Sequence, residues 1–133
     1  MSEREFSLPV RVYWEDTDAA GVVYHAQYVA FLERARSEWL RSKGISQVAL
    51  KAQQGIQFVV ASLQCEFVKP ARFDDQLQVT AQIAEAKRAS FRFKQQVLRQ
   101  DEILLNAEVL VVCVDALSFK PKRLPNELAL WGA

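Results

Sequence analysis

The chain is poor in the residues on which several kinds of chemistry depend. Its 133 residues include one histidine, two cysteines, four glycines and four prolines. A zinc site needs closely spaced cysteine and histidine ligands, and this sequence has none with that spacing. Cys65 and Cys113 lie inside strand-like runs, which favours buried, reduced thiols over a disulfide.

Long apolar runs and a strong net charge are also absent. The longest apolar run, residues 109–114, is far too short to span a bilayer, so we expect no integral membrane segment. Residues 1–8 are polar and mixed in charge with no apolar segment after them, so we expect no signal peptide. The net charge of +1 gives no general attraction to nucleic acid. Any positive site must therefore be local.

The length suits one domain, predicted over residues 1–133, and no repeat, linker or low-complexity segment divides it. Pro9–Trp14 is predicted to be a strand and Glu15–Gly21 a turn. A helix is predicted to begin near His25 and to end before Gly44, and a shorter one to follow over Ser46–Gln54, capped by Ser46. The apolar stripe of the first helix has helical spacing: Tyr28, Phe31, Leu32, Ala35, Trp39 and Leu40.

From Gln57 onward the apolar residues alternate with polar ones, as in strands exposed on one side. We expect one face of the first strand to carry Val59, Ala61, Leu63, Cys65 and Phe67. The last long strand, Ile103–Val114, is almost wholly apolar, which indicates a central strand buried on both faces. Four successive strands and one long helix predict an α+β domain, with an antiparallel sheet of about five strands wrapped around the helix.

The polar residues that could form a chemical site lie just before the long helix, in the stretch YWEDTDAAGVVYHAQYVAFLERAR that starts at Tyr13. Asp18 and His25, the only histidine, are the candidates for catalysis. A second interpretation stays open, because Asp16 or Asp18 can serve to cap a turn or helix. His25 can likewise be a structural residue at a helix start. Metal binding is not expected, since an EF-hand loop beginning at Asp16 would have Gln27 in place of its bidentate glutamate.

The stretch EDTDAAGVVYHAQYVAFLERAR, together with PARFDDQL and LLNAEVLVVCVDALSFKPKRLP, resembles the hotdog-fold acyl-CoA thioesterases of the 4-hydroxybenzoyl-CoA thioesterase type. Within that family it is most similar to the YbgC-like proteins associated with the Tol–Pal system. The resemblance covers essentially the whole chain and implies a hotdog fold. It also implies a cytoplasmic, cofactor-free homotetramer, built from dimers whose sheets join edge to edge with the active site at the dimer interface.

The same resemblance assigns roles to residues. It places the essential carboxylate on Asp18 and the residue next to the thioester on His25, with Tyr13 and Tyr24 as aromatic residues flanking the site. A helix start has unpaired N–H groups and a positive dipole end, which can stabilise the oxyanion of thioester hydrolysis. Asp18 can attack the carbonyl or deprotonate a water, and the sequence does not choose between these routes.

Coenzyme A carries phosphates, for which Lys87 and Arg88 are the predicted contacts, with the basic segment Lys120–Arg123 as a second group. Each of these cations can equally be solvated surface charge. Val59 and Val60 are expected to line the pantetheine or acyl channel. The predicted function is hydrolysis of an acyl-CoA, with an aliphatic chain, to free acid and CoA. The alternatives are a protein that binds acyl groups or acyl carrier protein with little turnover, and a hotdog-fold dehydratase or hydratase.

Overall fold

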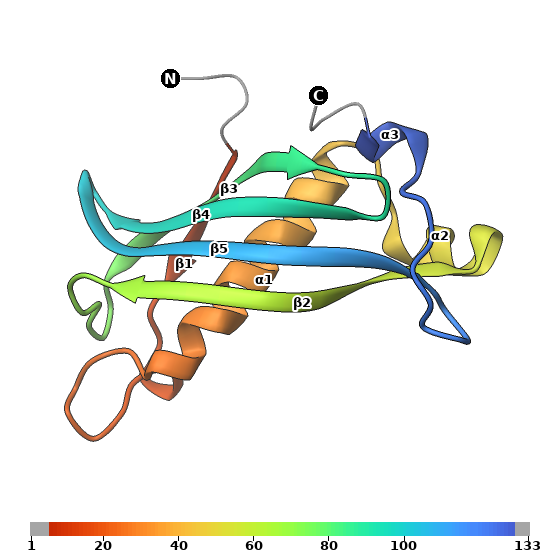
Figure 1. Ribbon diagram of the computed structural model, residues 1–133. Helices are drawn as coiled ribbons and strands as arrows, with labels where there is room; N and C mark the ends of the chain where they lie inside the picture. The colour runs from red at the N-terminus through yellow and green to blue at the C-terminus, as the bar shows by residue number, and fades with distance from the viewer. Residues whose placement is uncertain (1–5, 130–133) are drawn as a thin grey trace.

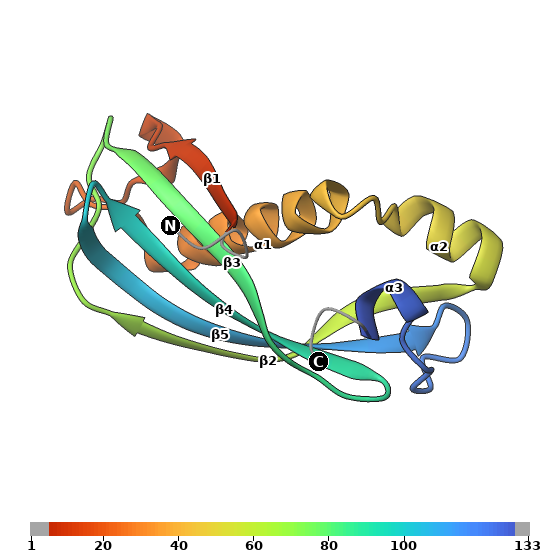
Figure 2. The same ribbon diagram turned by 90° about the horizontal axis from the view of Figure 1, so that it is seen from above.

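The computed structural model describes residues 6–129, so residues 1–5 and 130–133 of the predicted domain lie outside it. A five-stranded antiparallel sheet curves around one long helix, α1, with strand order β1-β3-β4-β5-β2 (Figures 1 and 2). This arrangement confirms the predicted α+β class. In chain order the elements are β1 (Phe6–Arg11), a short 3₁₀ helix (Trp14–Asp16), α1 (His25–Ser42), α2 (Gln47–Gln54), β2 (Ile56–Phe67), β3 (Gln76–Ala86), β4 (Ser90–Arg99), β5 (Glu102–Asp115) and α3 (Asn126–Ala129).

Helix α1 begins at His25 and buries the predicted apolar stripe against the concave side of the sheet. Near its end the Trp39 ring packs edge-on against Phe93, with 5.4 Å between ring centroids. The chain leaves the helix through Gly44, whose φ of +76° is the left-handed conformation that glycine adopts at least cost. Ser46 then caps α2 by accepting the N–H of Ala49 at 3.1 Å, as the sequence predicts.

Strand β5 lies inside the sheet, between β4 and β2, which confirms its predicted central position. Its burial on both faces was a wrong prediction. Leu105, Ala107 and Val109 point toward α1 and are buried, whereas Asn106 and Glu108 point the other way and are only half-buried. The reason is that α1 covers only one of the two faces of the sheet (Figure 2).

Two strand predictions need correction. In β2 the ladder with β5 shifts register between Val60 and Ser62. The extra residue moves Val59 to the outer face, so the predicted alternation holds only from Leu63 onward. The first strand ends at Arg11 and not at Trp14, because Asp16 Oδ2 accepts the N–H of Tyr13 and turns the chain into the 3₁₀ helix.

The turn after α1 yields a stability test. A Cβ added at Gly44 would meet no atom within 4 Å, so Gly44→Ala tests the backbone conformation alone. We expect a loss of about 1 kcal/mol in the free energy of unfolding, measured by chemical denaturation. Gly44→Asn is the matched control, because asparagine tolerates positive φ better than alanine. Equal losses for the two variants would contradict this explanation.

Candidate active site

Asp16 connects the 3₁₀ helix to the start of α1. Its carboxylate is buried and accepts the N–H of Tyr13 at 2.8 Å, while its carbonyl accepts the N–H of Tyr24 at 2.9 Å. Tyr24 is the residue immediately before α1. Asp16 thus has the structural, turn-capping place that the sequence leaves open for it, and it anchors the first residue ahead of the helix.

Asp18 lies in the exposed loop that follows. Its Oδ1 accepts the N–H of Ala20 at 2.9 Å, and its own N–H donates to the carbonyl of Val22, also at 2.9 Å. Gly21, with φ of +80°, closes this tight turn. One oxygen of the Asp18 carboxylate therefore stabilises the turn. The other has no hydrogen-bond partner in residues 6–129, and it is available to a ligand.

The start of α1 is open. Tyr24 provides no side-chain cap, and within the described part of the chain the backbone N–H groups of His25 and Ala26 have no acceptor. Unpaired N–H groups at a helix N-terminus attract anions and developing negative charge. The Tyr24 and His25 rings lie 4.6 Å apart on the same exposed surface. This end of the helix can therefore receive a carbonyl oxygen.

Asp18 and His25 belong to the same end of α1, but they do not bond to each other. The chain before the loop pairs with the chain after it, so that Asp16 lies opposite Tyr24 and Asp18 lies farther along, opposite Val22. Both Asp18 and His25 are exposed in the single chain. In the single chain the Asp18 carboxylate is therefore not desolvated, and only a bound ligand or a second chain would cover it.

A neighbouring loop, residues 68–75, holds the start of α1 in place. The N–H of Val23 donates to the carbonyl of Ala71 at 2.8 Å, and the N–H of Ala71 donates to the Tyr28 hydroxyl at 3.0 Å. Tyr28 is buried, and this burial raises its pKa, although the hydrogen bond from Ala71 opposes the rise. The hydroxyl thus remains neutral and accepts this bond across the ordinary pH range.

Ion pairs fasten the same loop to the β4–β5 turn. Glu102 contacts both Lys69 and Arg99 at 2.8 Å, and Arg99 also contacts Asp75 at 2.7 Å. The hydrogen bonds from Lys69 and then from Arg99 lower the pKa of Glu102 to about 2. These contacts tie residues 69 and 75, on the two sides of Ala71, to the sheet.

The remaining predicted site residues are spread along the chain. Tyr13 is exposed beside the 3₁₀ helix, next to a surface pair formed by Trp14 and Phe73 with ring centroids 5.1 Å apart. Val59 and Val60 line a cleft of about 280 Å³ between α1 and the sheet. Lys87 and Arg88 form the β3–β4 turn, at the opposite end of the molecule from the start of α1 (Figure 1). Within one chain these residues do not converge on Asp18.

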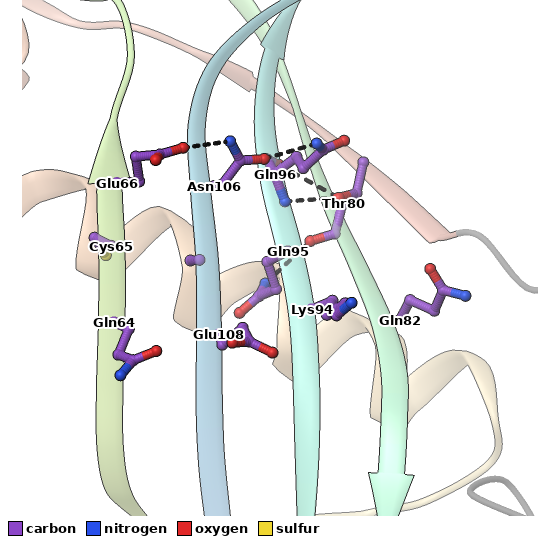
Figure 3. A pocket seen from close by; sticks show the side chains of 11 residues that line it. Gln64, Cys65, Glu66, Thr80, Gln82, Lys94, Gln95, Gln96, Asn106 and Glu108 are labelled. Atoms are coloured by element: carbon purple, nitrogen blue, oxygen red, sulfur yellow. Dashed lines mark hydrogen bonds between the residues drawn. The ribbon is translucent and has the colours of Figure 1, made fainter.

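A larger trough, of about 600 Å³, lies over the middle of strands β2 to β5 (Figure 3). Asn106 donates to Glu66 at 3.0 Å and accepts from Gln96 at 2.8 Å, so that a chain of side-chain hydrogen bonds crosses three strands. These groups satisfy one another at the surface, and none belongs to the loop that carries Asp18.

Sequence reasoning missed one charged residue in the core. Arg36 is only 8% exposed and donates to Gln95 at 3.1 Å, and it lines the same cleft as Val60. A signal was present, because Arg36 lies four residues after Leu32 and four before Leu40, on the apolar stripe itself. A charge at a stripe position indicates a side chain with a specific partner or ligand.

Comparison with known proteins places this arrangement in a family. The profile of the thioesterase-like superfamily matches residues 12–132. Acyl-CoA thioester hydrolase YbgC of Escherichia coli is 50% identical over 129 residues, which are 96% of each chain. Acyl-CoA thioesterase YbgC of Haemophilus influenzae is 44% identical over 128 residues, covering 96% of this chain and 94% of its own.

Solved structures agree. A probable thioesterase from Bartonella henselae superposes with a TM-score of 0.87 at 36% identity, covering 91% of this chain and 99% of the other. A mutant 4-hydroxybenzoyl-CoA thioesterase complexed with 4-hydroxybenzoyl-CoA has a TM-score of 0.90 over 98% of this chain and 99% of its own. Since it is 22% identical, that second likeness shows the fold alone.

The chain therefore belongs to the thioesterase-like superfamily, as a YbgC-like protein with the hotdog fold. This confirms the resemblance read from its residues, and it makes the chain an enzyme of the thioester hydrolase class. None of the helices in residues 6–129 is long and apolar enough to cross a membrane.

The ion pairs beneath the site predict a pH dependence of stability. The pKa of Glu102 is lower in the folded chain than in the unfolded one, so the folded state is favoured above the ordinary glutamate pKa. This contribution is lost as the pH falls from about 5 toward 2. We expect the Tm difference between wild type and Glu102→Gln to shrink to nothing over that range. Asp101→Asn, at a neighbouring exposed carboxylate outside the described ion pairs, is the control. A difference that persists at pH 2 would contradict the assignment.

Proposed function

We propose that this chain hydrolyses the thioester of aliphatic acyl-CoA substrates to the free acid and CoA, with Asp18 as nucleophile or general base. The observation that carries the proposal is the uncapped start of α1, with the N–H groups of His25 and Ala26 unpaired beside the loop of Asp18. These donors would bind the thioester oxygen as it gains negative charge, a contribution whose loss typically slows a reaction by about 10²–10³-fold.

Two chemical routes fit Asp18. As nucleophile, its carboxylate adds to the carbonyl carbon, the carbon–sulfur bond breaks, CoA leaves as a thiolate that takes up a proton, and water then hydrolyses the acyl anhydride. As general base, Asp18 takes a proton from water as the water oxygen adds to the carbonyl carbon, the carbon–sulfur bond then breaks, and the proton passes to the leaving CoA thiolate. His25, the first residue of α1, would contact the reacting group in either case.

A second chain would complete the site. Strand β2 is an edge strand of 12 residues that pairs with β5 on one side only, and it contains no proline or lysine. Its exposed side chains include Val60, Leu63 and Phe67. A long apolar edge of this kind invites pairing with another chain, whereas the opposite edge, β1, has six residues including Pro9. We infer a dimer joined through β2, which two such dimers would extend to a homotetramer.

Antiparallel pairing of β2 with its copy would bring the separated site residues together. The Lys87–Arg88 turn lies at the same end of the sheet as the start of β2, with β5 between β4 and β2, and the first turn of α1 lies by the end of β2, where the rings of Tyr28 and Phe67 are 5.8 Å apart. In a twofold dimer the start of one β2 lies beside the end of the other. The partner's basic turn would then face this chain's Asp18 loop.

The basic segment Lys120–Arg123 would join the same phosphate site. The N–H of Leu124 donates to the carbonyl of Arg88 at 2.8 Å, which places this segment against the Lys87–Arg88 turn. Lys122 contacts Asp115 at 3.7 Å and Lys87 contacts Glu85 at 3.9 Å. Arg88 and Arg123 have no such carboxylate among the described residues, so they are the better candidates for binding the phosphates of CoA.

We further infer a cytoplasmic location, which two free cysteines, Cys65 and Cys113, support because oxidising compartments favour disulfides. A thioester on acyl carrier protein is a second substrate form compatible with the same exposed site. Neither inference changes the chemistry proposed for Asp18.

The role of Asp18 is tested by thiol release from a panel of acyl-CoAs that runs from short to long chains and includes benzoyl-CoA and 4-hydroxybenzoyl-CoA. We expect Asp18→Asn to lower kcat by at least about 10²-fold, since its amide can neither attack nor accept a proton. Asp101→Asn, at an exposed carboxylate of the β4–β5 turn, should keep wild-type turnover. Wild-type turnover by Asp18→Asn would exclude the proposed role.

The two-chain site is tested by mixing inactive variants. Asp18→Asn and Arg88→Glu should each have little activity alone. If Arg88 serves the partner's Asp18, refolding the two together gives half mixed dimers, each with one intact site, and restores about a quarter of wild-type activity. In the control mixture, Asp18→Asn is refolded together with Arg34→Glu, a variant on the exposed side of α1, in place of Arg88→Glu. A lack of recovery in stable mixed dimers would show that the residues act within one chain.

A further inference from the structure

Arg36 is a charged side chain placed in an apolar layer. It lies on the buried side of α1 with 8% of its surface exposed, between Leu32 and Leu40 of the apolar stripe. The hydrogen bond to Gln95 Oε1, at 3.1 Å, is its one bond in the described structure, and Gln95 is itself held by the carbonyls of Leu32 and Thr80 at 3.0 and 3.1 Å. The partner of this buried cation is therefore a neutral amide.

Most of the hydrogen-bonding capacity of Arg36 is unused. A guanidinium has five N–H donors, and no ion pair of residues 6–129 includes this one. Desolvation lowers the pKa of Arg36, and the attraction of Glu33 opposes that effect. Every fully buried side-chain nitrogen and oxygen in the described residues has a partner, so the free donors of Arg36 must open into the cleft that it lines.

The sheet side of this cleft is apolar, formed by Phe58, Val60, Phe91, Phe93 and Val111, and Leu40 of α1 adds to it. The polar residues of the lining, Glu33, Ser37 and Gln47, come from α1 and α2. The volume of about 280 Å³ suits part of a small molecule and not a polypeptide. A cation with free donors beside aromatic and aliphatic walls selects an apolar ligand with one anionic, planar group.

We propose that this cleft binds the carboxylate of an apolar organic acid, with Arg36 as its counter-ion and Gln95 holding the guanidinium in position. Glu33 also lines the cleft, where it is exposed and attracts Arg36. It competes with an incoming carboxylate, so Glu33→Gln should strengthen binding.

Two sources of this carboxylate fit the geometry. One is a free fatty acid. The other, which rests on the proposed function, is the distal carboxylate of an acyl chain whose thioester lies at the start of α1. Arg36 is eleven residues after His25, about 16 Å along the helix, and helical side chains lean back toward the N-terminus. An extended acyl chain of medium length bridges that separation.

Calorimetric titration with decanoate tests the first source, with 1-decanol as the neutral counterpart. We expect the wild type to bind decanoate in preference to decanol, and Arg36→Met to weaken decanoate binding by at least about tenfold. Arg34→Gln, at an exposed position of the same helix, should bind as the wild type does. Glu33→Gln should bind more tightly.

The second source is tested by comparing kcat/KM for the CoA monothioester of decanedioic acid with that for decanoyl-CoA. A preference for the dicarboxylic substrate that disappears in Arg36→Met, with decanoyl-CoA turnover retained, would identify the distal carboxylate as the ligand. Absence of hydrolysis of any thioester by the wild type would refute the proposed function. The decanoate titration would still show whether the cleft binds a carboxylate.

Folding and assembly are measured on the same variants. Arg36→Met removes a buried charge that lacks a counter-ion, but it also leaves the buried Gln95 Oε1 without its donor, so its Tm is measured to confirm that the variant still folds at the assay temperature. The proposal is overturned if neither decanoate binding nor the substrate preference depends on Arg36. It is equally overturned if Arg36→Met dissociates the oligomer with both ligand readouts unchanged, since Arg36 would then pair with a second chain.

Discussion

The burial of the α1 stripe against the concave face of the sheet is the constraint on which the rest of the structure depends. Phe31, Leu32 and Trp39 are almost completely buried, and they fix both the position and the rotation of the helix. Because a helix is rigid, fixing its middle also fixes where its first N–H groups point. The start of α1 can then stay uncapped, since its stability comes from packing and not from a capping side chain.

The cost of an uncapped start is met by its surroundings. Tyr24 is bonded to Asp16, and Val23 is bonded to Ala71, so the chain enters the helix along a defined path. Both supports come from other segments: the 3₁₀ helix on one side and the loop fastened by Glu102 and Arg99 on the other. The open N–H groups of the first turn are thus held in a set direction, which is the condition under which they can stabilise charge in a transition state.

The sequence predicted the features that depend on residues close together in the chain. The spacing of the stripe, the Ser46 cap and the end of the helix before Gly44 follow from neighbouring residues, and each was predicted. The bulge in β2 was missed because it depends on the register with β5, which no alternation inside β2 encodes. For the site, sequence placed Asp18 and His25 at one end of α1, but it could not show that Lys87 and Arg88 lie at the other. The sequence analysis missed Arg36 because helical spacing was used to identify apolar residues only. A cation at a stripe position was therefore not counted as part of the stripe.

Edge strand β2 and the buried Arg36 share one feature, which is incomplete hydrogen bonding in the isolated chain. Both leave polar groups of the isolated chain without full partners beside apolar surface: backbone N–H and C=O groups along β2, and guanidinium N–H groups in the cleft. A strand edge can be satisfied by a copy of itself, because its donors and acceptors alternate. A lone cation cannot, since two copies of it repel, and it needs an anion from elsewhere. Pairing through β2 would therefore close the side of the cleft without neutralising Arg36. It would leave the guanidinium in a drier and more apolar chamber, in which an ionised carboxylate is attracted to it more strongly than in the single chain.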